Sequence, residues 1–60
     1  MNTRLKTKRQ EKGLTQAQIA DKAKVTTQGY QNYEAGKRTP NVKTAKLIAQ
    51  ALDSTVEELF

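Results

Sequence analysis

Helix-start and helix-stop signals recur at short intervals along this chain, and they leave room only for short helices. Gly13 and Gly36 each follow a stretch with helical patterning, and glycine readily takes the left-handed conformation that ends a helix. Thr15, Thr26 and Asn41 each precede another such stretch, and their side chains are of the kind that caps a helix start. No stretch has the alternating, β-branched pattern of a strand. The sequence therefore predicts an all-α fold.

Five short helices arranged as one compact bundle account for these signals. Thr15-Gln16-Ala17-Gln18 and Thr55-Val56-Glu57-Glu58 both fit a capping box, in which the side chain at the third helical position bonds back to the cap. We expect helices from about Asn2 or Thr3 to Lys12, from the Thr15 cap to about Ala23, from about Thr27 to Ala35, from about Val42 to Leu52, and in a last turn that carries Val56, Leu59 and Phe60.

The composition excludes most catalytic and metal-binding functions. The 60 residues suffice for one small domain. They include no Cys and no His, which removes disulfides, thiolate zinc sites and the commonest acid–base catalyst. The six carboxylates form no pattern with a nucleophile or a Gly-rich loop. We therefore expect no enzyme activity, no cofactor and no metal site.

The positive charge of the chain is unevenly distributed. Eleven Lys and Arg against six Asp and Glu give a net charge of +5. Residues 1–13 carry five basic side chains and one acidic, a net +4, whereas residues 14–36 are neutral and residues 37–60 carry a net +1. This basicity suggests a polyanionic partner, although charge alone fits a solvated surface equally well. The apolar stretches are too short for a membrane span or a secretory signal, so we expect a cytoplasmic chain without a membrane partner.

The third predicted helix has an aromatic face and a polar face. At about 100° per residue, Tyr30 and Tyr33 lie together on the inner side. Amide side chains donate and accept together, so each can pair with adenine N6 and N7 in the major groove of DNA. An ordinary solvated surface would also suit such residues, but the two caps and the tight turn before this helix favour DNA. The polar side chains of the outer face are Thr27, Gln28, Gln31 and Asn32.

The amino ends of the second and third helices are suited to bind phosphate. Their unpaired N–H groups and partial positive charge attract anions. Phosphate contacts position a protein on DNA, whereas contacts to base edges read the sequence. The residues at these ends are Thr15, Gln16 and Thr26, and the basic residues that extend the charge on either side are Arg4, Arg9, Lys37, Arg38 and Lys43.

Several segments, in order, resemble the phage-repressor (Cro-type) helix-turn-helix family, also called the xenobiotic-response-element family. They are Leu14-Thr15-Gln16-Ala17-Gln18-Ile19-Ala20, Val25-Thr26, Tyr33-Glu34-Ala35-Gly36-Lys37-Arg38-Thr39-Pro40, Ile48-Ala49 and Leu52. The resemblance covers about residues 4–60. It implies a single DNA-binding domain over residues 1–60, in which helices two and three form the helix-turn-helix. It further implies a sequence-specific regulator of transcription, a repressor that acts as a homodimer on double-stranded DNA operators. Such a protein would come from a prokaryote or a phage and would associate with the bacterial nucleoid.

The resemblance also implies roles for single residues. Thr27, Gln28 and Asn32 match the family's base readers, and Gln31 lies nearby. Residues that match its phosphate contacts are Arg9, Thr15, Gln16, Lys37 and Arg38. Arg9 and Glu34 match an ion pair between the first and third helices. A structural role for this pair carries equal weight, because Arg9 shares a helix face with Leu5 and a buried charge needs a partner.

Three residues depart from the family pattern. Lys24 stands where the family often has Gly in the turn, which predicts strain if the residue is left-handed. Gly29 lies inside the third helix, where it destabilises the helix. It would allow a close approach to helix two or to DNA, or else it is a neutral substitution without a role. Tyr30 replaces an aliphatic residue, and we expect its hydroxyl to reach solvent or a phosphate.

A protein-interaction module is the alternative function, antitoxin-like or an anti-repressor partner. Its basis is the apolar chain end, Val56, Leu59 and Phe60, which would equally serve as core or as a contact between two copies. DNA and protein partners differ in salt response, because each neutralised phosphate makes DNA affinity fall with added salt. Single-stranded RNA is disfavoured, because its readers stack bases on aromatic rings and this chain has only two Tyr and one Phe.

Overall fold

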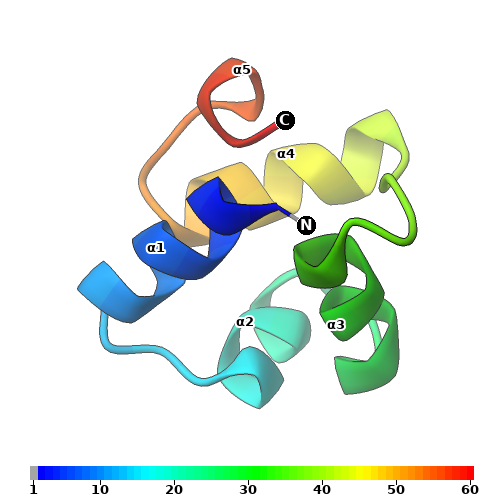
Figure 1. The fold of residues 1–60 in the computed structure, drawn as a ribbon, viewed down its shortest axis with the longest axis horizontal. Helices are drawn as coiled ribbons and strands as arrows, with labels where there is room; N and C mark the ends of the chain where they lie inside the picture. The colour runs from blue at the N-terminus through cyan, green and yellow to red at the C-terminus, as the bar shows by residue number, and fades with distance from the viewer. Residues whose placement is uncertain (1) are drawn as a thin grey trace.

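The structure is a computed structural model that describes residues 2–60. This part of the chain contains five helices. They are α1 (Thr3–Glu11), α2 (Gln16–Lys22), α3 (Thr27–Ala35), α4 (Val42–Ala51) and α5 (Val56–Leu59), and residues 2–60 contain no strand. The predicted all-α fold is confirmed. In Figure 1, α2 and α3 lie at one end of the molecule, α4 passes behind α1, and α5 lies at the other end.

The helix starts follow the capping signals in the sequence. The hydroxyl of Thr15 accepts from the backbone N–H of Gln18 at 3.1 Å, and the Gln18 side chain accepts from the Thr15 N–H at 2.8 Å. This reciprocal pair is the predicted capping box of α2. Thr26 caps α3 and Asn41 caps α4 through the same kind of side-chain acceptor. The predicted starts of these three helices are therefore confirmed.

The capping box predicted for α5 is only half formed. The Thr55 hydroxyl accepts from the Glu58 N–H at 3.1 Å, as expected for a cap. The Glu58 carboxylate does not return to the Thr55 backbone, because it accepts instead from the Ser54 hydroxyl at 2.9 Å. The prediction of a complete box was wrong, since the Ser54 hydroxyl competes for the carboxylate.

Four helices end in the same way, with a left-handed residue just beyond the last turn. The left-handed residues are Gly13, Lys24, Gly36 and Asp53. The next N–H after each returns to a carbonyl five residues earlier, as Val25 does to Ala20 at 3.0 Å. This tight ending places Lys12, Ala23 and Leu52 in cap positions, so α1, α2 and α4 each end one residue before the predicted boundary.

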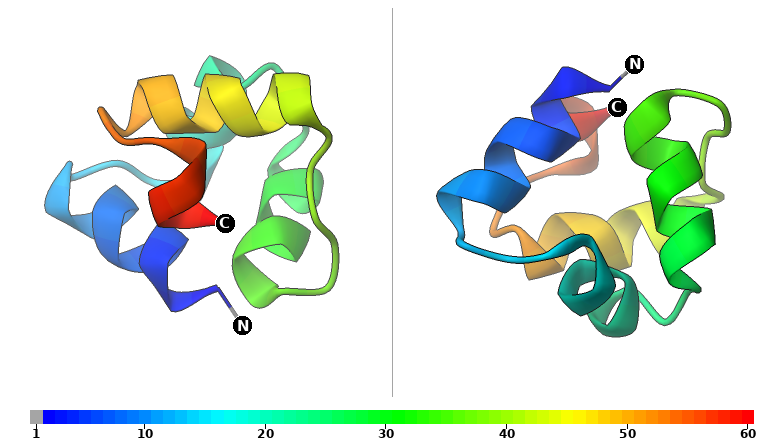
Figure 2. Two further views of the ribbon diagram at one scale, coloured as in Figure 1. Left: turned by 90° about the horizontal axis from the view of Figure 1, so that it is seen from above. Right: turned by 60° about the horizontal axis from the view of Figure 1, so that its bottom comes forward.

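One core joins all five helices. Each helix turns its apolar stripe inward, and α2 packs closely against both α3 and α4 (Figures 1 and 2). Full burial of one large aliphatic or aromatic side chain contributes about 1.5–3 kcal/mol. These contacts hold α3 in a fixed orientation. The buried residues of the core are Leu5, Ile19, Ala20, Ala23, Tyr30, Ile48, Ala49, Leu52 and Leu59.

Asn2 ties the two ends of the described chain together. Its Oδ1 accepts from the N–H of Leu5 at 3.2 Å and so caps α1. Its Nδ2 donates to the carbonyl of Leu59 in α5 at 2.7 Å. Its backbone N–H donates to the carbonyl of Glu34 at 2.9 Å. One residue therefore connects the start of α1 with the ends of α3 and α5.

Replacing Lys24 by Gly is expected to stabilise the protein. Lys24 has a φ of 60°, in the left-handed region where a Cβ atom is strained. Removing that strain outweighs the extra freedom of glycine in the unfolded chain, so the free energy of unfolding should rise by about 1 kcal/mol. Denaturant titration followed by circular dichroism measures the gain. Lys24→Ala keeps the Cβ atom and should show no such gain, and equal stabilisation by both variants would contradict the strain argument.

Candidate nucleic-acid interface

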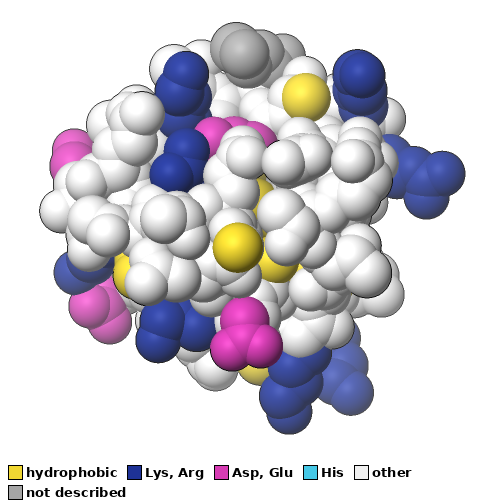
Figure 3. Space-filling model, turned by 90° about the horizontal axis from the view of Figure 1, so that it is seen from below, with side chains coloured by type: hydrophobic (Ala, Val, Ile, Leu, Met, Phe, Trp, Pro, Cys, Tyr) yellow, Lys and Arg dark blue, Asp and Glu magenta, His cyan; other side chains and the backbone are white. Residues whose placement is uncertain are grey.

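The helix-turn-helix unit formed by α2 and α3 presents one polar surface of the molecule. The turn between the two helices is short because the left-handed Lys24 reverses the chain directly after the Ala23 cap. Figure 3 views the molecule from below, the end at which α2 and α3 lie in Figure 1, and shows a largely uncharged centre with Lys, Arg, Asp and Glu side chains around it. This surface therefore combines neutral side chains at its centre with charged side chains of both signs around them.

The four predicted base-reading residues, which we call the recognition face, lie along one side of α3. Thr27 and Gln28 are exposed, whereas Gln31 and Asn32 are half-buried. The structure therefore brings the four side chains to one surface of one helix. On the opposite side of α3, Tyr30 is fully buried and Tyr33 packs against the core. The amides thus face outward and the phenol rings inward.

The Tyr30 hydroxyl does not reach solvent, contrary to the prediction. Its oxygen is buried and makes no hydrogen bond within residues 2–60. Burial raises the pKa of Tyr30, and the neighbouring Glu34 carboxylate adds to the increase. The sequence position could not reveal this environment, because the ring is enclosed by side chains from several helices. Tyr30 is therefore a core residue whose hydroxyl is not available to a phosphate.

Gly29 does not serve a close approach of α3 to α2. A Cβ atom added there would meet the Thr26 hydroxyl at 3.1 Å and no atom of α2 within 4 Å. The N–H of Gly29 donates to that same hydroxyl at 3.0 Å. Gly29 therefore leaves room for the cap of its own helix.

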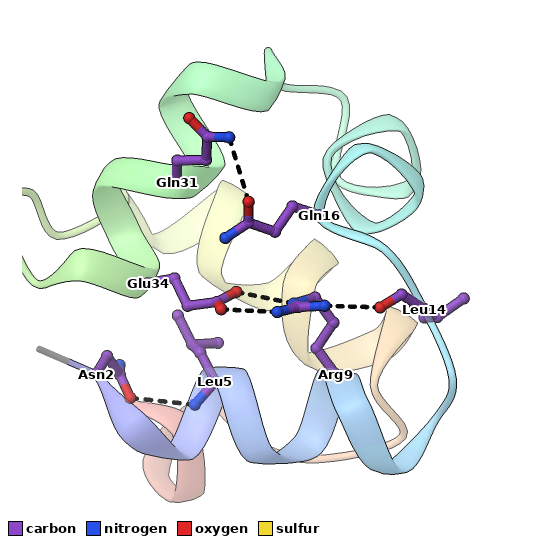
Figure 4. A network of polar contacts seen from close by, with 7 residues as sticks. All are labelled: Asn2, Leu5, Arg9, Leu14, Gln16, Gln31 and Glu34. Atoms are coloured by element: carbon purple, nitrogen blue, oxygen red, sulfur yellow. Dashed lines mark hydrogen bonds and ion pairs between the residues drawn. The ribbon is translucent and has the colours of Figure 1, made fainter.

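Arg9 and Glu34 form a mostly buried, two-pronged ion pair that joins α1 to α3 (Figure 4). Nε and Nη2 of Arg9 donate to the two Glu34 oxygens at 3.0 and 2.9 Å, and Nη1 donates to the carbonyl of Leu14 at 2.8 Å. The side chains are 12% and 6% exposed. Burial, the largest single effect, would raise the pKa of Glu34, but the hydrogen bonds and charge of Arg9, together with the neighbouring Tyr30 and Gln16 side chains, outweigh it and lower the pKa. These contacts of Arg9 hold α3 in place against α1.

The stability of the protein is expected to fall in acid as Glu34 takes up a proton. Its folded pKa lies below the ordinary value of 4.5, so the ionised pair stabilises the fold fully above that pH and less as the pH drops through the folded pKa. Denaturant titrations at a series of pH values should show this decline. Glu34→Gln should flatten it, whereas Asp53→Asn should change it little, because Asp53 is exposed. An unchanged acid decline in Glu34→Gln would contradict the assignment.

A second contact, not predicted from the sequence, joins α2 to the recognition face. The Nε2 of Gln31 donates to the Oε1 of Gln16 at 3.2 Å, across the helix-turn-helix (Figure 4). Both residues are half-buried. The sequence analysis assigns both residues to the interface with DNA but does not pair them. Their pairing could have been suspected because both are amides and lie on neighbouring helices.

The predicted phosphate-binding residues differ in their exposure to solvent. Thr15 and Thr26 use their hydroxyl oxygens as caps, which leaves the hydroxyl protons as donors. The backbone N–H groups of Lys37 and Arg38 both donate to the carbonyl of Asn32, at 2.9 and 3.3 Å. This attachment holds the basic loop against the end of α3. Exposed members of the set are Thr15, Thr26, Lys37, Arg38 and Lys43, whereas Gln16 and Arg9 are partly covered.

The apolar chain end belongs mainly to the core. Leu59 is buried, Val56 is half-buried against the core cluster, and Phe60 is 39% exposed.

No helix within residues 2–60 is long and apolar enough to cross a membrane.

Comparison with known proteins confirms the family resemblance. The family model described as helix-turn-helix matches residues 5–59. Over 56 residues the chain is 42% identical to the HTH-type transcriptional regulator YqaE of Bacillus subtilis, covering 93% of this chain and 48% of that protein. It is 39% identical over 57 residues to the SPbeta prophage-derived HTH-type transcriptional regulator YonR of the same organism, covering 95% and 53%. It is 36% identical over 56 residues to the cryptic phage CTXphi transcriptional repressor RstR of Vibrio cholerae, covering 93% and 50%.

The matched region is only part of each relative, because the chain spans about half the length of these three proteins. No solved structure matches the chain significantly. The match of the family model runs through all five helices, from Leu5 in α1 to Leu59 in α5. The chain therefore belongs to the helix-turn-helix family, in its Cro-type branch of transcriptional regulators.

Proposed function

We propose that this protein binds double-stranded DNA in a sequence-specific manner, with α3 in the major groove. The observation that carries the proposal is the division of α3 into an outward polar face and an inward aromatic face. A helix fits the major groove, where the four base pairs present distinct donor and acceptor patterns. Gln28 and Asn32 lie four residues apart on α3, so their amides point the same way toward neighbouring base pairs.

Phosphate contacts on both sides of the recognition face would fix α3 in the groove. Thr15, Gln16 and Thr26 lie at the amino ends of α2 and α3, where N–H groups point outward. Lys37 and Arg38 project from the loop that Asn32 anchors, and Lys43 follows at the start of α4. We assign Arg9 mainly to the support of α3, because its guanidinium is bonded to Glu34 and Leu14.

We further propose that the protein is a repressor that binds as a homodimer. The repressor RstR, whose matching half is 36% identical, supports this output. Helix-turn-helix dimers bind half-sites about one helical turn apart, so the bound sequence should be a palindrome with that spacing.

Selection of bound sequences from a pool of random duplexes tests the proposal. We expect one enriched motif, arranged as two inverted half-sites. Gln28→Ala and Asn32→Ala should each relax the motif at a different base position. Selection that enriches no motif would reject sequence-specific binding, and a single half-site without its inverted copy would reject the dimer.

Replacing Arg38 by Ala is expected to weaken binding to all duplexes alike. The exposed Arg38 side chain would contact phosphate rather than bases, so its loss removes affinity without changing sequence preference. The slope of log affinity against log salt should become shallower by about 0.9 for one lost phosphate contact. Fluorescence anisotropy at several salt concentrations measures both quantities. Lys12→Ala removes the same charge at the far end of α1, where Lys12 pairs with Asp53, and should leave the slope unchanged.

A further inference from the structure

The Tyr30 hydroxyl is a buried polar group without a hydrogen bond in the described part of the chain. Tyr30 is fully buried, and its hydroxyl oxygen has no partner within residues 2–60. Buried polar groups are normally paired, because an unpaired one destabilises the fold. A phenylalanine ring at this position would fill the core without that loss. The folded, free protein therefore gains nothing from this hydroxyl.

The Glu34 carboxylate is a neighbouring acceptor for the hydroxyl. Tyr30 and Glu34 lie four residues apart on α3, so their side chains leave the same face of the helix, and both residues are buried. Burial raises the pKa of Tyr30, and the Glu34 carboxylate raises it further, as a nearby negative charge does. Both oxygens of that carboxylate already accept from Nε and Nη2 of Arg9. The hydroxyl is thus a donor beside a carboxylate that Arg9 occupies.

A phosphate contact by Arg9 would compete with its bonds inside the protein. The Arg9 side chain is only 12% exposed, and its Nε, Nη1 and Nη2 all donate to Glu34 or to Leu14. Arg9 lines a pocket of about 460 Å³ between α1, α2 and α3, through which its guanidinium can turn outward to a phosphate. Turning removes a donor from Glu34, whose side chain is 6% exposed. A buried carboxylate that loses a donor destabilises the fold unless another donor replaces it.

We propose that Tyr30 is a positioning residue whose hydroxyl takes over one oxygen of Glu34 when Arg9 turns toward a phosphate of DNA. The inference rests on the proposed binding of DNA. Glu34 then keeps two donors throughout, both from Arg9 in the free protein, and one each from Arg9 and Tyr30 in the complex. A hydroxyl rotates about its C–O bond while the ring stays in place, so the exchange leaves the core packing intact. An aliphatic residue at position 30 has no such donor.

A double-mutant cycle in the free protein tests whether the hydroxyl can serve Glu34. Tyr30→Phe alone removes an unbonded hydroxyl and should not lower the Tm. Tyr30→Phe combined with Arg9→Met should lower the Tm by several degrees relative to Arg9→Met alone, because the hydroxyl is then the donor that replaces Arg9. Equal effects of Tyr30→Phe in the two backgrounds would overturn the inference. If Arg9→Met does not fold, Arg9→Lys serves as the second background, with the same expected difference.

Salt titrations of DNA binding test the exchange itself. Fluorescence anisotropy compares the wild type with Tyr30→Phe on the selected operator and on an unrelated duplex. Tyr30→Phe should weaken binding to both duplexes, and the slope of log affinity against log salt should become shallower by about 0.9, the loss of one phosphate contact. The matched control is Tyr33→Phe, which removes a hydroxyl from a half-buried ring on the same helix and should keep the wild-type slope. An unchanged slope in Tyr30→Phe would overturn the inference.

The two experiments distinguish failure of this inference from failure of the proposed function. If the wild-type protein binds no duplex, the DNA-binding function fails and the exchange fails with it, whereas the cycle in the free protein still reports the hydroxyl contact with Glu34. If the wild type binds its operator and Tyr30→Phe binds with the same affinity and slope, the DNA-binding function stands and Tyr30 is a core residue alone.

Discussion

Replacing Glu34 by Ala is expected to unfold a large part of the protein before it affects any contact with DNA. The change takes the carboxylate partner away from the Arg9 side chain, which is only 12% exposed in the wild-type structure. Breaking a buried ion pair by removing one member costs about 3–5 kcal/mol. A domain of 60 residues has a total stability of roughly 3–9 kcal/mol, so this loss approaches the whole. Thermal unfolding followed by circular dichroism should show a strongly lowered Tm.

Two control variants separate the buried charge from other effects of the Glu34 change. Arg9→Met combined with Glu34→Leu removes both charges and fills the space with apolar groups, which should recover much of the stability. Lys12→Ala breaks the exposed pair with Asp53 and should leave the Tm almost unchanged. If Glu34→Ala melted like the wild type but bound DNA poorly, the pair would act on DNA rather than on the fold.

Gln28→Ala and Asn32→Ala are each expected to weaken binding to the best operator by about 1–3 kcal/mol, a loss of roughly 5- to 150-fold in affinity. The reason is the removal of an amide that pairs with a base edge in the major groove. Each variant should lose discrimination at one base position, and the two positions should differ. Anisotropy titrations against the selected operator and its single-base variants measure the change.

Gln50→Ala is the matched control for the amide variants. Gln50 is an exposed glutamine on α4, outside the recognition face, and its removal should leave both affinity and preference unaltered. The stability of each variant is measured in parallel, because Gln28 is exposed and Asn32 is half-buried. Equal weakening on all sequences in Gln28→Ala or Asn32→Ala would show that these residues do not read bases.

The helices were predictable because their boundaries depend on a few neighbouring residues. The capping box at Thr15 needs only Gln18, three residues away, and the left-handed ends at Gly13 and Gly36 need only glycine. The prediction of a complete capping box at Thr55 was wrong because of another nearby residue, Ser54, whose hydroxyl competes for the Glu58 carboxylate. Local signals thus predict well until two local partners compete.

Contacts between residues far apart in the sequence could not be predicted from such local signals. The environment of the Tyr30 hydroxyl depends on side chains from several helices, and a helical periodicity shows only that the ring points inward. The Gln16–Gln31 hydrogen bond spans 15 positions and needs the angle between α2 and α3, which the sequence does not specify. The base-reading and phosphate-binding assignments stay predictions, since they concern a molecule that lies outside the chain.

Asn2 couples the opening of α1 to the opening of α5. Separate short helices commonly open independently and at low free energy, which exposes their amide hydrogens to exchange. Here the opening of α5 would take away the Leu59 carbonyl that Asn2 binds, and the loosened Asn2 would then uncap α1. The single turn of α5 and the first turn of α1 therefore form one opening unit, and their amide hydrogens should exchange with solvent together.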